Sequence, residues 1–188
     1  RLIGLPADRR AAVNDIYLES GRYFLPGDDQ MAVLDIHFAH FYDFKAGTRL
    51  RVLLRGQEET FESVGVAVSP EYLFLSPSEQ EIIASARSFA ILFVPQETLA
   101  RLLGLPGRVN QVGVLVSSPD ARAAVVSSTE EVLKPYALSK TTLRENVPAV
   151  QALQMDLEGY REIAATVPAM ILIIGALSVY ITLSRMVQ

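Results

Sequence analysis

The chain has 188 residues, and half of them are apolar, so it can bury one substantial core or two small ones. Its 21 acidic residues outnumber 17 basic residues that are scattered along the chain, which argues against a nucleic-acid surface because phosphate binding needs clustered Lys and Arg. The absence of cysteine excludes disulfides, zinc–thiolate sites and thiol nucleophiles.

The stretch DIHFAHFYD, residues 35–43, holds both histidines of the chain. His37 and His40, with Asp35 and Asp43 nearby, could be drawn as a metal site. The alternative is a short amphipathic helix that carries both histidines on roughly one face. Because no third defined ligand accompanies the histidines, we favour the helix and expect neither a metal nor a cofactor.

Residues 49–68 predict a β-hairpin. The stretch RLRVLLRG alternates apolar and basic side chains, as a strand with one buried face does. KAGT before it supplies a turn at Gly47. FESVGVAV repeats the alternation after the polar stretch GQEET, so we expect the two strands to pair. Glu58 and Glu59 are then solvated carboxylates in the turn.

The stretch SPEYLFLSPSEQE, residues 69–81, carries an apolar patch between two Ser-Pro breaks. Two interpretations stay open: a loop that contacts a partner, or a strand packed on the core. The patch consists of Tyr72, Leu73, Phe74 and Leu75.

The next region predicts strand, helix, strand and helix, so we expect an α+β domain with a mixed sheet and short helices. SFAILFVP is apolar on both faces and stops at Pro95, which is typical of a central strand. PQETLARLLGLPG predicts a short helix closed by Gly104, and QVGVLVSS predicts an alternating strand. Ser118 is expected to cap a helix that runs to Leu133, and ALSKTTLREN predicts an extended segment.

The end of the chain predicts a stalk and a transmembrane helix. Residues 163–184 contain no Asp, Glu, Lys, Arg or His. About 20 such residues, at about 1.5 Å each, match the roughly 30 Å hydrocarbon core of a bilayer. A buried core helix is the alternative, but such helices are usually shorter and show a polar stripe. A helical pattern from Asn146 reaches this stretch without a Gly/Ser-rich linker, which predicts a continuous stalk over residues 146–162.

Residues within and beside the apolar stretch fit a bilayer. The stretch begins at Ile163, and Pro168 comes early enough for its missing hydrogen bond to be tolerated. Gly175 could let another helix approach closely, and Tyr180 suits the interface. Arg161 and Arg185 flank the two ends, so charge alone does not orient the helix.

The sequence shows no catalytic motif: no nucleophile elbow, no phosphate-binding loop and no dinucleotide fingerprint. We therefore expect no enzyme activity in this chain. Two other classes stay open: a single-span binding protein that the helix only anchors, and a membrane-bound hydrolase using carboxylates such as Asp28, Asp29 or Asp35.

Four stretches occur in an order that is informative when they are taken together: ESGRYFLPGDDQMAVLDIHFAHFYDFKAGTRLRV, VGVAVSPEYLFLSPSEQE, FAILFVPQETLARLLGLPGRVNQVGVLV and ALSVYITLSRMV. This order resembles the MacB-like/FtsX-like ABC transporter permeases, and the similarity runs from about Gly4 to Val187. The motif residues of the folded part are Gly21, Arg22, Gly47, Pro70, Glu71, Tyr72, Pro95, Gly104 and Asn110.

The resemblance implies a division of the chain into four parts. Residues 1–145 would be a MacB-type extracytoplasmic core domain that lacks its N-terminal part, and residues 146–162 the juxtamembrane stalk. Residues 163–184 would be the transmembrane helix, and residues 185–188 the start of a cytoplasmic segment. The resemblance thus places Arg185 on the cytoplasmic side of a bacterial inner membrane.

The resemblance also implies partners. A separate ATPase subunit would hydrolyse ATP, and a second permease subunit would complete a dimer. The extracytoplasmic domain would transmit the motion for substrate export, or to a periplasmic adaptor or another extracytoplasmic partner.

Overall fold

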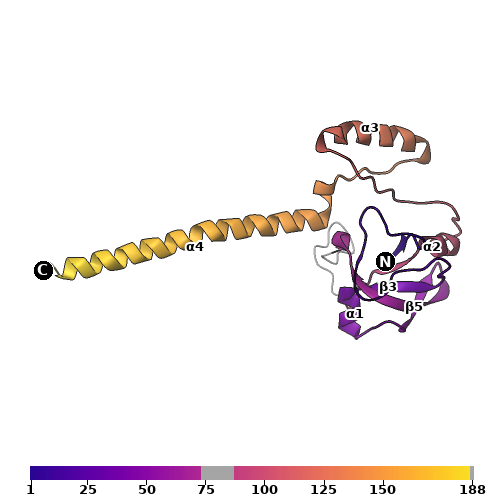
Figure 1. Cartoon of the computed structure of the whole chain (residues 1–188), viewed down its shortest axis with the longest axis horizontal. Helices are drawn as coiled ribbons and strands as arrows, with labels where there is room; N and C mark the ends of the chain where they lie inside the picture. The colour runs from indigo at the N-terminus through magenta and orange to yellow at the C-terminus, as the bar shows by residue number, and fades with distance from the viewer. Residues whose placement is uncertain (73–86, 187–188) are drawn as a thin grey trace. The chain divides into compact units, whose positions relative to one another are not determined.

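The computed structural model describes residues 1–72 and 87–186 (Figure 1). The chain divides into two compact units, Arg1–Thr141 and Thr142–Gln188. The first unit contains a mixed β-sheet with short helices, and the second is dominated by one long apolar helix. The expected α+β class is therefore confirmed.

One sheet of six strands lies in the described part of the first unit, in the order β1-β6-β3-β5-β2, with β4 also paired to β5. β1 runs parallel to β6 and β3 parallel to β5, whereas the other pairs are antiparallel. The strands are β1 (Leu2–Leu5), β2 (Tyr17–Gly21), β3 (Met31–Asp35), β4 (Arg49–Leu54), β5 (Gln57–Val68) and β6 (Leu92–Pro95).

β5 organises the sheet because its 12 residues are enough for three partners. Its first half pairs with β4 and its second half with β2, along the same edge. β3 pairs with the opposite edge, from Met31 beside Glu62 to Asp35 beside Ala67. β5 thus has neighbours on both sides, and its second half is mostly buried.

Both faces of the sheet are covered, which explains why β3 and β6 are apolar on both sides. Val33 and Phe93 pack on one face with Ile16 and Phe24, which come from the segments around β2. On the other face Leu34 packs with neighbours from β5 and β6 and with side chains of the helices α1 and α2. The buried central strand predicted to stop at Pro95 is confirmed as β6.

Two short helices begin where β3 and β6 end. In α1 (Ile36–Tyr42) the Asp35 side chain accepts a hydrogen bond from the backbone N–H of His37 and caps the helix. α2 (Gln96–Leu102) is followed by Gly104, which has a φ of 69° and closes the helix as the sequence predicts. Both helices contact the strands that precede them.

The predicted β4–β5 hairpin is confirmed, but its turn is shorter than expected. Arg55 and Gly56 have φ values of 52° and 82°, and they alone connect Leu54 to Gln57. Such positive φ values belong to tight two-residue hairpin turns that match the twist of paired strands. The expected turn over residues 56–60 is therefore wrong, and Glu58 and Glu59 lie in β5.

The segment from residue 103 to residue 148 contains no buried side chain. The predicted strand at residues 111–118 is wrong: these residues have no regular strand structure, and Val112 and Val114 are about half exposed. Alternation alone does not make a strand when no neighbouring strand supplies hydrogen bonds. The helix after Ser118 is confirmed, as the 3₁₀ turn η2 (Pro119–Ala121) followed by α3 (Arg122–Leu133).

The remaining 3₁₀ turns of the described residues are η1 (Pro70–Tyr72), η3 (Lys134–Tyr136) and η4 (Arg144–Asn146). In the second unit, α4 (Pro148–Met186) is one unbroken helix of 39 residues. The predicted continuity between stalk and apolar stretch is confirmed, since neither Gly159 nor Pro168 ends the helix.

Candidate functional site

The first motif residues lie against the middle of β5, where β2 and β4 meet along its edge. Gly21 has a φ of 78°, and a Cβ atom there would lie 2.3 Å from the Val64 carbonyl oxygen. The backbone N–H of Arg22 donates to the same oxygen at 3.0 Å, and that of Gly47 donates to the Ser63 carbonyl at 2.7 Å. These three residues hold the backbone of the sheet together, which is a structural function.

The acidic turn after Arg22 is tied to its surroundings by two ion pairs. The Arg22 guanidinium donates to Asp28 at 2.6 Å, and this hydrogen bond holds the pKa of Asp28 below its usual range. Asp29 accepts from the Thr98 hydroxyl at 2.7 Å and from Arg101, and the Thr98 bond lowers its pKa. Both aspartates are thus held in ion pairs within the sheet unit.

Asp35 differs from these two carboxylates because it is buried. Its Oδ1 accepts from the His37 backbone N–H at 3.0 Å and lies 3.1 Å from His37 Nδ1, whereas its Oδ2 is buried and has no hydrogen-bond partner among the described residues. Burial raises the pKa of Asp35. No local pattern indicated this burial, although an Asp directly before a helix does indicate its capping function.

The metal site that could be drawn around the histidines is not formed. His37 faces Asp35, whereas Nε2 of His40 lies 2.9 Å from a carboxylate oxygen of Glu19 on β2. Within residues 1–72 and 87–186 no group of three or more His, Asp or Glu side chains is arranged to hold a metal ion.

The predicted contact patch is divided between core and undescribed residues. Tyr72 is only 8% exposed and packs in the core, and burial raises its pKa to about 12. Its ring therefore faces the domain interior and not a partner. Pro70 opens the turn η1, and the side chain of Glu71 accepts from Asn14 at 3.0 Å. Leu73, Phe74 and Leu75 lie outside the described residues.

Two further motif residues of the first unit lie just before and just after α2. Pro95 is the fully buried end of β6, and Gly104 follows the helix. Arg55 of the hairpin turn donates to the Leu103 carbonyl at 2.6 Å, which satisfies a carbonyl at the end of α2. Asn110 is exposed in the loop that follows.

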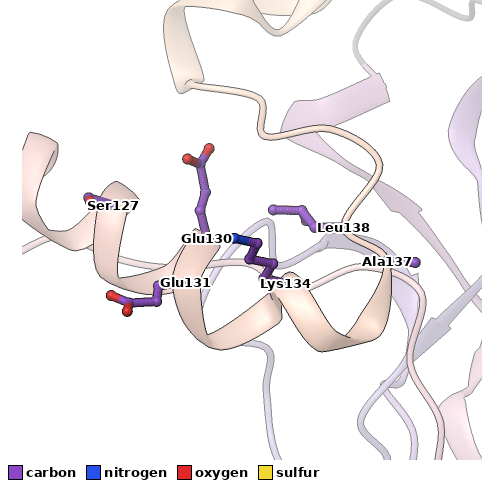
Figure 2. A pocket seen from close by; sticks show the side chains of 6 residues that line it. All are labelled: Ser127, Glu130, Glu131, Lys134, Ala137 and Leu138. Carbon is purple, nitrogen blue, oxygen red and sulfur yellow. The ribbon is translucent and has the colours of Figure 1, made fainter.

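An open depression lies beside α3 and η3 (Figure 2). The side chains of Glu130 and Glu131 point in different directions, and no set of polar groups converges in it. Its lining residues are Ser127, Glu130, Glu131, Lys134, Ala137 and Leu138.

The apolar part of α4 is the feature with the clearest functional meaning. In the part of the chain that the structure describes, α4 is the one helix long and apolar enough to cross a bilayer. Its residues 163–184 span about 33 Å at 1.5 Å per residue, close to the roughly 30 Å bilayer core. Large apolar side chains are exposed all around it. For example, the exposed fractions of Ile163, Leu172 and Leu177 are 58%, 73% and 54%. Such a helix is compatible with a transmembrane segment.

Two hydroxyl groups inside this stretch bond to their own helix. The Ser178 hydroxyl donates to the Ile174 carbonyl at 2.8 Å, and the Thr182 hydroxyl donates to the Ser178 carbonyl at 2.8 Å. Hydroxyl groups of transmembrane helices are commonly satisfied in this way. Gly175 leaves open space at its Cβ position. Tyr180 is 69% exposed, and Arg185 lies in the last turn.

Comparison of the sequence with models of protein families found no match, and comparison with curated protein sequences found none either.

Proposed function

We propose that this chain is part of a permease subunit of an ABC transporter, similar to the MacB-like/FtsX-like permeases. The sheet unit is an extracytoplasmic domain of the MacB type, and α4 crosses the inner membrane with Arg185 on the cytoplasmic side. The chain has no catalytic residues of its own. A separate ATPase subunit hydrolyses ATP, and a second permease subunit completes the assembly.

The observation that carries this proposal is the continuity of α4. Its polar first part, residues 148–162, and its apolar part share one helix without a break. At about 1.5 Å per residue, the 39 residues of α4 form a helix of about 58 Å that continues past Pro168. Movement at the cytoplasmic end therefore reaches the end of the helix beyond the bilayer, which a flexible linker would not allow.

Extending the gene in both directions gives the first test. We expect further membrane helices in the same polypeptide and an adjacent ATPase gene, whose product co-purifies with the permease. A gene that encodes a single membrane helix and has no ATPase partner would favour the alternative, a membrane-anchored extracytoplasmic binding domain.

A substitution at Gly159 tests whether the helix transmits motion. Gly159→Pro removes a backbone donor and strains the helix, whereas Gly159→Ala fits because nothing lies within 4 Å of the new Cβ atom. In the complete transporter we expect Gly159→Pro to abolish ATP-driven export while the ATPase still binds. Gly159→Ala should keep export. Equal export by both variants would contradict transmission through α4.

A further inference from the structure

The first part of α4 carries an apolar stripe in which three large side chains are exposed. Leu153, Leu157 and Tyr160 are 46%, 59% and 70% exposed. With Val150 they follow spacings of three, four and three residues, which is the heptad pattern of a coiled-coil seam. The pattern continues through Ala164 and Val167 into the apolar stretch.

The charged residues of this part lie beside the stripe and not in it. Asp156 precedes the seam residue Leu157, and Arg161 follows the seam residue Tyr160, so the two occupy opposite flanks of the seam. No ion pair in the described part of the chain involves either residue. Their charges are therefore available to a neighbouring helix.

The spacing of these two charges selects the partner. In a parallel two-stranded coiled coil, a flanking residue before one seam position faces the residue five positions later in the other helix. Asp156 and Arg161 are five positions apart, so two copies of α4 side by side would form the Asp156–Arg161 pair twice. In the antiparallel arrangement equivalent flanks face each other, so the flank that carries Asp156 would face the same flank of the other helix and the Asp156–Arg161 pairs would not form.

We propose that the stalk part of α4 pairs in parallel with α4 of a second copy of this chain, through Val150, Leu153, Leu157 and Tyr160, with Asp156 of each copy facing Arg161 of the other. The inference rests on the proposed function in one respect, that both copies cross the same bilayer and therefore run in the same direction. It names the residues through which two permease subunits meet.

Cysteine cross-linking tests the pairing, because this chain has no cysteine of its own. Leu157→Cys and Glu158→Cys are introduced separately into the full polypeptide, in which any other cysteines have been replaced. Native membranes that contain each variant are treated with a bifunctional thiol reagent. The reach of this reagent is shorter than the roughly 10 Å between the axes of packed helices. Since Leu157 is in the seam and Glu158 is outside it, we expect about tenfold more homodimer from Leu157→Cys. Equal yields, or a Leu157→Cys product with a different polypeptide, would overturn the proposal.

Charge exchange gives an independent test in the Leu157→Cys background. Asp156→Arg or Arg161→Asp alone places like charges across the seam, and each should lower the homodimer yield about two- to fivefold. The double exchange restores opposite charges and should restore the yield. A double variant that cross-links no better than the single variants contradicts the predicted register.

The pairing and the proposed function fail in different ways. Co-purification of the ATPase without cross-linking at Leu157→Cys would overturn the pairing alone. Cross-linking at Leu157→Cys without any ATPase partner would overturn the permease function and support the pairing.

Discussion

The sheet unit and the helix α4 satisfy their apolar side chains in opposite ways. In the sheet, Phe61, Val33 and Phe93 are at most 1% exposed, because helices and segments of the same chain cover both faces. In α4, residues such as Ile173 and Tyr180 are 60% and 69% exposed. The sheet unit therefore carries its own core, whereas the exposed apolar side chains of α4 are compatible with a helix that lies in a bilayer.

Among the substitutions that test this contrast, one in the core of the sheet unit should have the largest effect, on the free energy of unfolding. Phe61 is fully buried between the layers, and Phe61→Ala leaves a cavity, so we expect a loss of about 3–5 kcal/mol in the free energy of unfolding. Leu53→Ala on β4, where the side chain is 75% exposed, should change it by less than about 0.5 kcal/mol. Denaturant unfolding followed by tyrosine fluorescence measures both variants. Similar losses would mean that Phe61 is not part of an independent core.

Membrane insertion of α4 should depend on the charge of its side chains and not on their exact size. Ile173→Arg places a charge at the centre of the apolar stretch and should disfavour membrane insertion by about 2.5–3.5 kcal/mol. Ile173→Leu should leave insertion unchanged. The fraction of protein that resists alkaline extraction from membranes measures the difference. If Ile173→Arg inserts as well as Ile173→Leu, this part of α4 does not lie in the hydrocarbon core.

Two aspartates of the sheet unit should give smaller, opposite pH effects. The pKa of Asp28 is lowered by Arg22, so its stabilising contribution is present above about pH 3.9 and is lost as the pH falls through the folded-state pKa. The pKa of Asp35 is raised by burial, so its contribution is present below about pH 3.9 and is lost as the pH rises through the folded-state pKa.

These contributions are measured by unfolding the parent protein and the variants Asp28→Asn and Asp35→Asn over about pH 3 to 7. Each unit of difference between the folded-state and unfolded-state pKa corresponds to about 1.4 kcal/mol in the free energy of unfolding. Relative to the parent protein, Asp28→Asn should lose stability as the pH rises, and Asp35→Asn should gain it. Parallel pH profiles for the two variants would contradict the different environments of the two carboxylates.

Local patterns predicted the elements whose formation depends on neighbours in the sequence. Gly47 marked the turn before the hairpin, Pro95 marked the end of a buried strand, and Ser118 marked a helix start. The absence of charge from residue 163 to residue 184 predicted the long helix. Each of these signals acts over a few residues, or through composition alone.

Distant neighbours decided the features that the sequence did not show. The stretch QVGVLVSS has the alternation of a strand but finds no pairing partner in the described residues. The acidic turn gave no indication that Asp29 would bond to Thr98 and Arg101, 69 and 72 residues away. Tyr72 appeared as a possible contact residue because nothing local indicates which side chains the fold buries.

The sequence by itself determined the α4 helix, because backbone hydrogen bonds within a helix connect residues four apart and an uncharged stretch needs no distant partner to be recognised. It also determined the β4–β5 hairpin, whose strands are joined by a tight turn. Only the tertiary structure decided that β5 pairs with three strands and that Asp35 becomes buried. Strand pairing and burial depend on segments far apart in the chain, and the local pattern of residues does not encode which of them meet.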